Sequence, residues 1–158
     1  MSGPQVVGSI LIGADELVGE LVRSRIPHMQ DGAWGPFKAL GVVRNGKLVG
    51  GVVYHGYRVF DIQMSCAFDQ VGWALPRTVR ALLAYPFVDL GVQRVSAFTG
   101  RKNKKARKLL LDLGFTLEGV AKLGLDGFED AFAFALLKEQ CRWLKADGQK
   151  NTSRSSDA

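Results

Sequence analysis

The spacing of apolar residues along the chain alternates between the two-residue repeat of strands and the longer repeat of helices. Residues 6–12 read as a short apolar strand. A helical spacing begins at Asp15, and Pro27 stops it. Residues 29–37 form a Gly-rich loop whose Trp34 and Phe37 must pack on another element. The apolar positions of this first helix are Leu17, Leu21, Val22 and Ile26.

Residues 39–55 predict two strands around Asn45-Gly46, the dipeptide favoured in type I′ hairpin turns. A third strand follows over residues 57–68, and its strict alternation separates two faces. One face is apolar, and the other carries three polar side chains in a row. The apolar face holds Phe60, Ile62, Met64, Cys66 and Phe68; the opposite face holds Val59, Asp61, Gln63, Ser65 and Ala67.

The second half predicts two further helices, each followed by strands. Pro76 suits the first turn of a helix that Pro86 kinks or ends. A strand over residues 93–99 precedes a helix with Asn103 as its N-cap and Gly114 as its C′ residue. A closing hairpin turns at Asp126-Gly127, and residues 138–144 add a turn of helix or an extended tail. The buried stripes are Val79, Leu82, Leu83 and Phe87 in one helix, and Ala106, Leu109, Leu110 and Leu113 in the other.

The order β-α-β-β-β-α-β-α-β-β mixes hairpins with crossover units. It predicts an α/β protein with a mixed, mostly antiparallel sheet of six to seven strands and three to four helices. A chain of 158 residues that is 47% hydrophobic suits one compact domain, expected over residues 1–145. Residues 146–158 hold no apolar residue larger than Ala, so we expect a disordered tail there.

The net charge of +6 is concentrated in one segment, which we call the basic cluster. Without these residues the 21 Lys and Arg fall to 15, equal to the 15 Asp and Glu. Cations at a helix N-terminus oppose the helix dipole, so their position needs a reason beyond solubility. Three explanations stay open: a solvated helix face, a nucleic-acid surface, or a phosphate site for a polyanionic cofactor. The basic cluster comprises Arg101, Lys102, Lys104, Lys105, Arg107 and Lys108.

Other features narrow the class of protein. Cys66 and Cys141 form no CxxC pattern and sit in apolar contexts, which predicts reduced core cysteines in a cytoplasmic protein. The first residues lack a basic leader, and no apolar run reaches the roughly 18 residues of a membrane span. We expect a protein that neither enters a membrane nor binds a metal.

The stretch from Arg94 to Gly119 resembles the second half of the GNAT superfamily of N-acetyltransferases. Asn103, Ala106 and the run 113–115 (Leu-Gly-Phe) fit the family spacing, as do residues 45–54 for the early strands. The ending over residues 135–144 looks like that of small GNAT-like proteins from phages and prophages. The resemblance covers roughly residues 38–145, and it implies a GNAT-like fold and acetyl-CoA as acyl donor.

The resemblance also implies where the cofactor binds. Family members hold the CoA pyrophosphate in a Gly-rich loop after the fourth strand, here residues 69–74, although Asp69 stands where a cation or Gln is expected. Small residues let backbone amides approach phosphate oxygens. The implied cofactor-binding residues are Ser65, Ala67, Gly72, Trp73, Ala74, Arg77, Asn103, Lys104, Arg107 and Lys108.

The resemblance points to two candidate catalytic bases, Asp61 and His55. Either could keep the acceptor amine neutral. Leu110 occupies the position where many relatives carry a Tyr that protonates the leaving thiolate. Either no acid is needed, since a thiol near pKa 8.5 is a tolerable leaving group, or the chain is slow or inactive.

The leading hypothesis is transfer of an acetyl group from acetyl-CoA to a primary amine, on a small molecule or a peptide. A homodimer is possible. The alternatives are a weak or inactive GNAT-like binding module of phage origin, and a nucleic-acid-binding or base-modifying relative. Nucleic acid is not favoured, because no recognition helix pair, zinc pattern or aromatic series accompanies the basic cluster.

Overall fold

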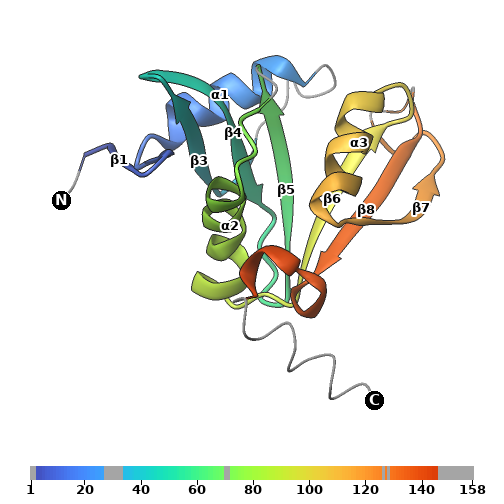
Figure 1. Ribbon diagram of the computed structural model, residues 1–158. Coiled ribbons are helices and arrows are strands. Elements are labelled where there is room, and N and C mark those ends of the chain that lie inside the picture. The colour runs from blue at the N-terminus through green and yellow to red at the C-terminus, as the bar shows by residue number, and fades with distance from the viewer. Residues whose placement is uncertain (1–2, 27–33, 70–71, 126, 128, 146–158) are drawn as a thin grey trace, which may run out of the picture.

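The computed structural model describes residues 3–26, 34–69, 72–125, 127 and 129–145, which form one eight-stranded sheet with three α-helices (Figure 1). The strand order is β1-β2-β3-β4-β5-β6-β8-β7, and among the described strands only β5 and β6 pair in parallel. The predicted mixed, mostly antiparallel sheet is confirmed. The strands are β1 (Gln5–Val7), β2 (Ile10–Ile12), β3 (Phe37–Arg44), β4 (Lys47–His55), β5 (Asp61–Phe68), β6 (Arg94–Gly100), β7 (Thr116–Ala121) and β8 (Ala131–Leu137), and the helices are α1 (Asp15–Arg25), α2 (Pro76–Ala84) and α3 (Lys104–Leu113).

The extra strand arises because the single strand predicted for residues 6–12 is two. Gly8, at a φ of +62°, reverses the chain between β1 and β2, and the two then pair antiparallel. The hairpin predicted at Asn45-Gly46 is confirmed. Both residues have positive φ, 54° and 75°, as a type I′ turn requires.

The third predicted strand begins later than its alternation suggests. β5 starts at Asp61, because the preceding Val59 has a φ of +66°, outside strand geometry. The expected inward place of Phe60 is therefore wrong: its side chain is 52% exposed. From Ile62 onward the alternation is confirmed, with Ile62 and Met64 in the main core.

The helices cover opposite faces of the sheet. α1 packs against β3, β4 and β5, and its buried residues are Val18 and Val22. The predicted stripe is confirmed at Val22, whereas Leu17 is 61% exposed and Val18 is buried in its place. Val18 fits here because β3 and β4 present glycines beneath it: a Cβ on Gly51 would lie 2.4 Å from Val18 Cγ1.

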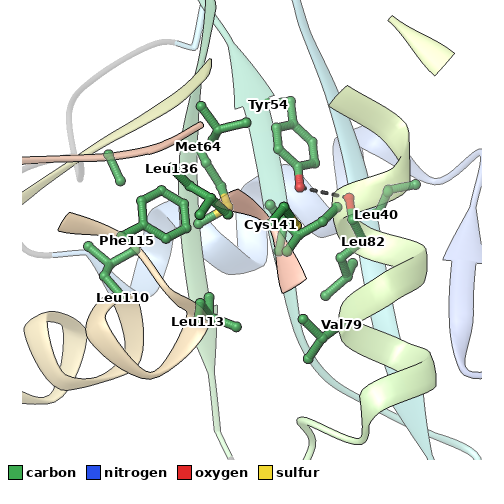
Figure 2. Close-up of a cluster of buried hydrophobic side chains, with 14 of the residues drawn as sticks. Leu40, Tyr54, Met64, Val79, Leu82, Leu110, Leu113, Phe115, Leu136 and Cys141 are labelled. Atoms are coloured by element: carbon green, nitrogen blue, oxygen red, sulfur yellow. Dashed lines mark hydrogen bonds between the residues drawn. The ribbon is translucent and has the colours of Figure 1, made fainter. Parts of the chain in front are cut away.

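α2 and α3 lie on the other face and share the main core. Figure 2 shows Leu110 and Leu113 of α3 facing Met64, with Val79 of α2 nearby. Tyr54, from β4, closes this core by donating its hydroxyl to the carbonyl oxygen of Leu82 at 2.8 Å.

Both predicted helix signals of the second half are confirmed. Pro76 is the first residue of α2, and the helix widens into a π-turn over Tyr85–Asp89, where Pro86 stands. The Asn103 side chain caps α3 by accepting from the Ala106 N–H at 3.1 Å. Gly114, at a φ of 105°, ends α3 by donating its N–H to Leu110 and Leu111 carbonyls.

Two short 3₁₀ turns, Lys138–Gln140 and Arg142–Leu144, replace the helix turn or tail expected after β8. Trp143 in the second turn braces the two helices: its indole N–H donates to the Leu113 carbonyl at 2.9 Å, and its own carbonyl accepts from Arg80 Nε at 2.9 Å. These two hydrogen bonds of Trp143 connect α2 to the end of α3. The closing hairpin forms as β7 and β8, although Asp126 of its turn and the tail over 146–158 lie outside the described residues.

Candidate active site

The main irregularity of the sheet is the separation of its two parallel strands. β5 and β6 pair only at their beginnings, through Asp61↔Arg94, Ile62↔Val95 and Gln63↔Ser96. Beyond these pairs the strands diverge, as Figure 1 shows. Beyond the three pairs, the facing edges of these described strands do not pair with each other, and their backbone groups need other partners.

A cavity of about 50 Å³ occupies this divergence, and we call it the cleft. β5 contributes residues 64–66, and β6 contributes residues 97–100. The end of α1 and the first turns of α3 close its sides. The lining residues from those helices and their caps are Ile26, Asn103, Ala106 and Leu110.

α3 begins at the cleft, where its cap Asn103 and its first turn contribute to the lining, and α2 follows β5 through the loop that contains Gly72. Helix N-termini carry partial positive charge and free N–H groups, which suits an anion. The loop before α2 includes Gly72, which has a φ of +89°; apart from its chain neighbours, no described residue lies within 4 Å of where a Cβ would stand. Arg44 holds this loop by donating to the Gly72 carbonyl at 2.7 Å.

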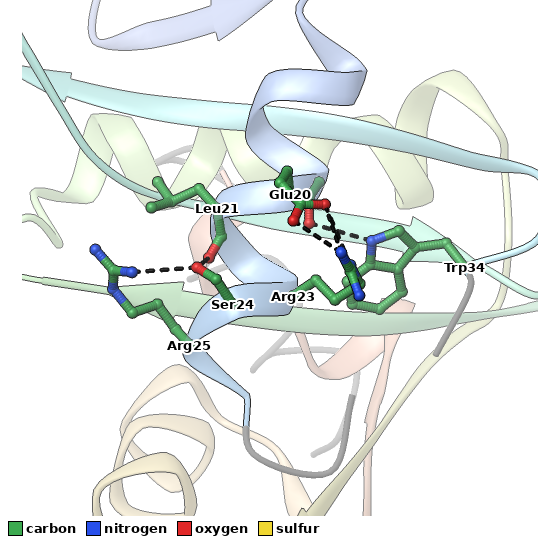
Figure 3. Close-up of polar contacts among 7 residues, drawn as sticks. Glu20, Leu21, Arg23, Ser24, Arg25 and Trp34 are labelled. Atoms are coloured by element: carbon green, nitrogen blue, oxygen red, sulfur yellow. Dashed lines mark hydrogen bonds and ion pairs between the residues drawn. The ribbon is translucent and has the colours of Figure 1, made fainter. Parts of the chain in front are cut away.

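Asp69, the acid that the sequence places in this loop, is paired with Arg25. The guanidinium at the end of α1 donates twice to the carboxylate, at 2.8 and 3.1 Å. These hydrogen bonds from Arg25 lower the pKa of Asp69. Figure 3 shows the contacts that position Arg25 at the end of α1. Its Nη1 donates to Ser24 Oγ at 3.1 Å, and Ser24 Oγ donates to the Leu21 carbonyl. Asp69 thus joins α1 to the loop as one half of an ion pair.

The other predicted residues of this region have different surroundings. Trp73 is 7% exposed and stacks on Phe68 with ring centroids 3.6 Å apart, so only its main chain could meet a phosphate. Ala67 packs with the core group under α1. Ala74 and Arg77 are exposed at the start of α2.

The basic cluster divides into residues with distinct partners. Lys108 points along the helix to Asp112, at 2.8 Å. Arg107 lies over the Phe132 ring at 5.1 Å, and its buried Nε has no hydrogen-bond partner within the described part of the chain. Lys104 is exposed in the first turn. Arg107 is therefore the cation of the cluster that packing holds in place.

Asp61 lies at the closed end of the sheet, where β5 and β6 still pair. Its Oδ1 accepts a hydrogen bond from Ser96 Oγ at 2.8 Å and lies 3.6 Å from Arg94 Nε. Arg94 also pairs with Glu118 of β7 at 2.7 Å. Asp61 is 9% exposed and does not line the cleft. This network ties three strands together below the cleft.

His55 lies at the end of β4 and reaches the cleft through Ser65. Its Nε2 is 3.1 Å from Ser65 Oγ, and Ser65 lines the cleft. Trp34 packs on the imidazole with ring centroids 5.1 Å apart and is anchored by donating to the Gly19 carbonyl at 3.2 Å (Figure 3). Burial lowers the pKa of His55, so the ring is neutral near pH 7.

Leu110, which the resemblance puts at the family's Tyr position, lines the cleft and is 3% exposed. Sequence reasoning missed other residues of the cleft. Thr99 lines it too, and its hydroxyl oxygen has no hydrogen-bond partner among the residues described. Its one sequence signal was a polar residue in the otherwise apolar end of β6. Glu129 lies beside the cleft residue Gly100 and accepts the Lys102 N–H at 3.2 Å.

No protein-family model matches the sequence, and no curated protein matches it. Solved structures do match. The GNAT-family acetyltransferase from Bacillus anthracis is 18% identical with a TM-score of 0.60, and the match covers 87% of this chain and 99% of that one. The ribosomal-protein-S5-alanine acetyltransferase from Vibrio fischeri is 17% identical, with a TM-score of 0.61 and coverage of 89% and 100%. The fold is that of the GNAT acetyltransferases.

A further GNAT-like match contains a ligand. The Campylobacter jejuni N-acetyltransferase PseH in complex with acetyl coenzyme A is 18% identical with a TM-score of 0.53, and the match covers 65% of this chain and 69% of that one. None of these comparisons supports the finer resemblance to phage and prophage proteins. Among the described residues, no group of three or more His, Cys, Asp or Glu gathers as a metal site, and no helix is long and apolar enough to cross a membrane.

Proposed function

We propose that this chain is an acyl-CoA-dependent N-acyltransferase, a single domain over residues 1–145 that transfers an acetyl group to a primary amine. The divergence of β5 and β6 carries the proposal. It opens a cleft through an otherwise continuous sheet, and the N-terminus of α3 lies beside this cleft. The GNAT fold of its structural neighbours supports the same activity.

The residues present suit acetyl-CoA. The open Gly72 and the exposed Ala74 leave room for a pyrophosphate to approach backbone amides. Arg77, Lys104 and Arg107 supply positive charge at the two helix starts. The pairing of Asp69 with Arg25 removes the repulsion that a free carboxylate would exert on phosphate. The narrow cleft beyond suits an extended arm, and its β5 and β6 edges offer hydrogen bonds.

Acetyl-CoA supplies a thioester, whose acyl carbon forms a bond to the amine nitrogen as the carbon–sulfur bond breaks. The amine must be neutral to attack, and the proton it loses must find a base. We assign that base to His55, neutral and linked to the cleft through Ser65. In this assignment Ser65 passes the proton to His55 Nε2. Asp61 holds the strands together through Ser96 and Arg94.

The leaving thiolate has no acidic side chain at the family's Tyr position, because Leu110 is buried there. It departs as the thiolate and takes a proton from solvent, since a thiol near pKa 8.5 leaves without obligatory acid catalysis. The acceptor is an amine on a small molecule or a peptide. The cytoplasmic location and the homodimer stay predictions.

Two measurements test the proposal. Acetyl-CoA at 100 times its Kd should stabilise the fold by ~2.7 kcal/mol, which a thermal-shift titration detects. A panel of amines with detection of released thiol should then identify the acceptor. No thermal response at millimolar acetyl-CoA would overturn the proposal, whereas binding without thiol release on any amine would reduce it to a CoA-binding module.

A further inference from the structure

Thr99 is a buried polar residue whose hydroxyl the fold does not use. It lies near the end of β6, is 6% exposed and lines the cleft. Its Oγ1 has no hydrogen-bond partner in the described part of the chain. A buried hydroxyl without a partner destabilises a fold by roughly 1–3 kcal/mol, so such groups are rare unless something else satisfies them.

Ser96, on the same strand, shows the ordinary case. It is 7% exposed, and its hydroxyl donates to Asp61 Oδ1 at 2.8 Å. Ser96 lies where β6 still pairs with β5, whereas Thr99 lies where the strands have parted. The residue with the unpaired hydroxyl therefore lies at the cleft.

The surroundings of Thr99 narrow the chemistry of a partner. Ala97, Ala106 and Leu110 make much of this wall apolar, so a free ion would be poorly solvated there. Thr99 pairs across the sheet with Phe132, which fixes its backbone. A hydroxyl both donates and accepts one hydrogen bond readily, and an amide on a slender, otherwise apolar chain offers both.

We propose that Thr99 is a positioning residue that hydrogen-bonds an amide of the pantetheine arm of the acyl donor. The inference rests on the proposed function and adds a residue that specifies the arm rather than the phosphates. In the free protein the Thr99 hydroxyl has no hydrogen-bond partner among the described residues, and the bound arm supplies one. Cofactor recognition thus carries a small cost in the stability of the free fold.

The test replaces Thr99 by Val, which keeps the shape and removes the hydroxyl, and by Ser, which keeps the hydroxyl. Free Thr99→Val should melt about 2–4 °C higher than the parent, because an unsatisfied buried group is gone. The same variant should bind CoA about 5–10-fold more weakly, the loss of one neutral hydrogen bond. Its affinity for adenosine 3′,5′-bisphosphate, which lacks the arm, should equal the parent's. Thr99→Ser should bind CoA like the parent.

Ser96→Ala is the matched control. It removes a buried hydroxyl that the fold uses, so it should lower the melting temperature and leave CoA affinity unchanged. Unchanged CoA affinity in Thr99→Val, or equal weakening toward the bisphosphate, would overturn the role of Thr99 while the proposed function stands. Failure of the parent to bind CoA would overturn the proposed function, and this inference with it.

Discussion

At the scale of single residues, the two candidate bases differ in what already surrounds them. Asp61 is held by Ser96 and Arg94 at the closed end of the sheet. His55 is linked to the cleft through one hydroxyl, and burial lowers its pKa. A base must be unprotonated and within reach of the proton it accepts. His55 meets both conditions, whereas Asp61 does not line the cleft and is bound by Ser96 and Arg94 instead.

His55→Gln should lower turnover about 100-fold, because general-base catalysis is worth roughly 10²–10⁴-fold. The parent's kcat/KM should fall with decreasing pH through an apparent pKa below the ordinary 6.5 of histidine. In His55→Gln this decrease of kcat/KM at low pH should be absent. A pH series of initial rates measures both, and an unchanged profile in His55→Gln would contradict the assignment.

The lowered pKa of His55 also makes the stability of the fold depend on pH. Its folded pKa lies below its unfolded value, so the unfolded chain binds the proton first as the pH falls. Stability present above about pH 6.5 is therefore lost as the pH drops through the folded pKa. Melting temperatures at pH 7.5 and 5.5 should differ less in His55→Gln than in the parent.

Asp61→Asn separates the alternatives. Asn can still accept from Ser96 and loses only the attraction of Arg94, so thermal stability should fall slightly. Turnover should stay within a few-fold of the parent if Asp61 only holds the strands. A 100-fold loss in Asp61→Asn together with normal His55→Gln would make Asp61 the base.

At the scale of elements, the sequence predicts best where local chemistry alone decides. α3 follows its signals from the Asn103 cap to the Gly114 end, since both act within a few residues. The face of α1 could not be predicted this way. Stripes through Leu17 and through Val18 are both compatible with its periodicity, and the glycines Gly41 and Gly51, distant in sequence, favour Val18.

Some residues of the candidate site can likewise be predicted from the local sequence, and others cannot. Asn103 and Ser65 could be found from spacing and alternation, because each lies on a regular element. The Asp69–Arg25 pair and the unpaired Thr99 hydroxyl could not. The first joins residues far apart in the chain, and the second depends on how far β5 and β6 diverge.

Asn103 should prove to have two separable roles. Asn103→Ala should cost ~1 kcal/mol of stability, because the cap on Ala106 N–H is lost. Asn103→Asp keeps an acceptor and a favourable charge at the helix start, so its stability should match the parent. Its carboxylate would face the mouth of the cleft and repel phosphate, weakening CoA. Chemical denaturation and calorimetric titration distinguish the two, and equal CoA affinity in Asn103→Asp would remove Asn103 from the binding site.

The close packing of α1 on β4 can be tested with a matched pair of glycines. Gly51→Ala should destabilise by ~1–3 kcal/mol, because its Cβ would meet Val18 Cγ1 at 2.4 Å and Leu40 O at 3.0 Å. Gly119→Ala, in β7, meets nothing within 4 Å and should change stability by less than ~0.5 kcal/mol. Since Arg25 at the end of α1 holds Asp69 and the next residue, Ile26, lines the cleft, Gly51→Ala should also weaken CoA binding. Denaturant midpoints near that of the parent for Gly51→Ala would contradict this packing.

At the scale of the whole molecule, the excess positive charge lies at the mouth of the one gap between the described strands. The six cations of the basic cluster account for the whole net charge of +6. A diffuse surface for a polyanion would treat them alike, whereas a cofactor site would not. The six cations already differ in the structure. Arg107 is held by packing on Phe132, whereas Lys108 forms an ion pair with Asp112.

Single Ala substitutions across the basic cluster should therefore give an uneven profile of CoA affinity. Arg107→Ala should cost the most, about 10–100-fold, because a charge-assisted phosphate contact is worth ~1.5–3 kcal/mol. Lys108→Ala should cost little, since an exposed pair contributes at most ~1 kcal/mol. Arg107→Lys keeps the charge and loses the stacking on Phe132, so its loss of CoA affinity should lie between those of Arg107→Ala and Lys108→Ala.

Dephospho-CoA identifies which phosphate the cluster meets. It should bind the parent more weakly than CoA, and the two should bind the most weakened variant about equally, because the contact to the 3′-phosphate is already gone. Duplex DNA measured across a salt series gives the opposing outcome. Equal small losses at all six positions, matched by equal losses of salt-sensitive DNA affinity, would make the cluster a diffuse polyanion surface. The start of α3 would then have no part in holding the cofactor, and Arg77 with the Gly72 loop would be left to bind its phosphates.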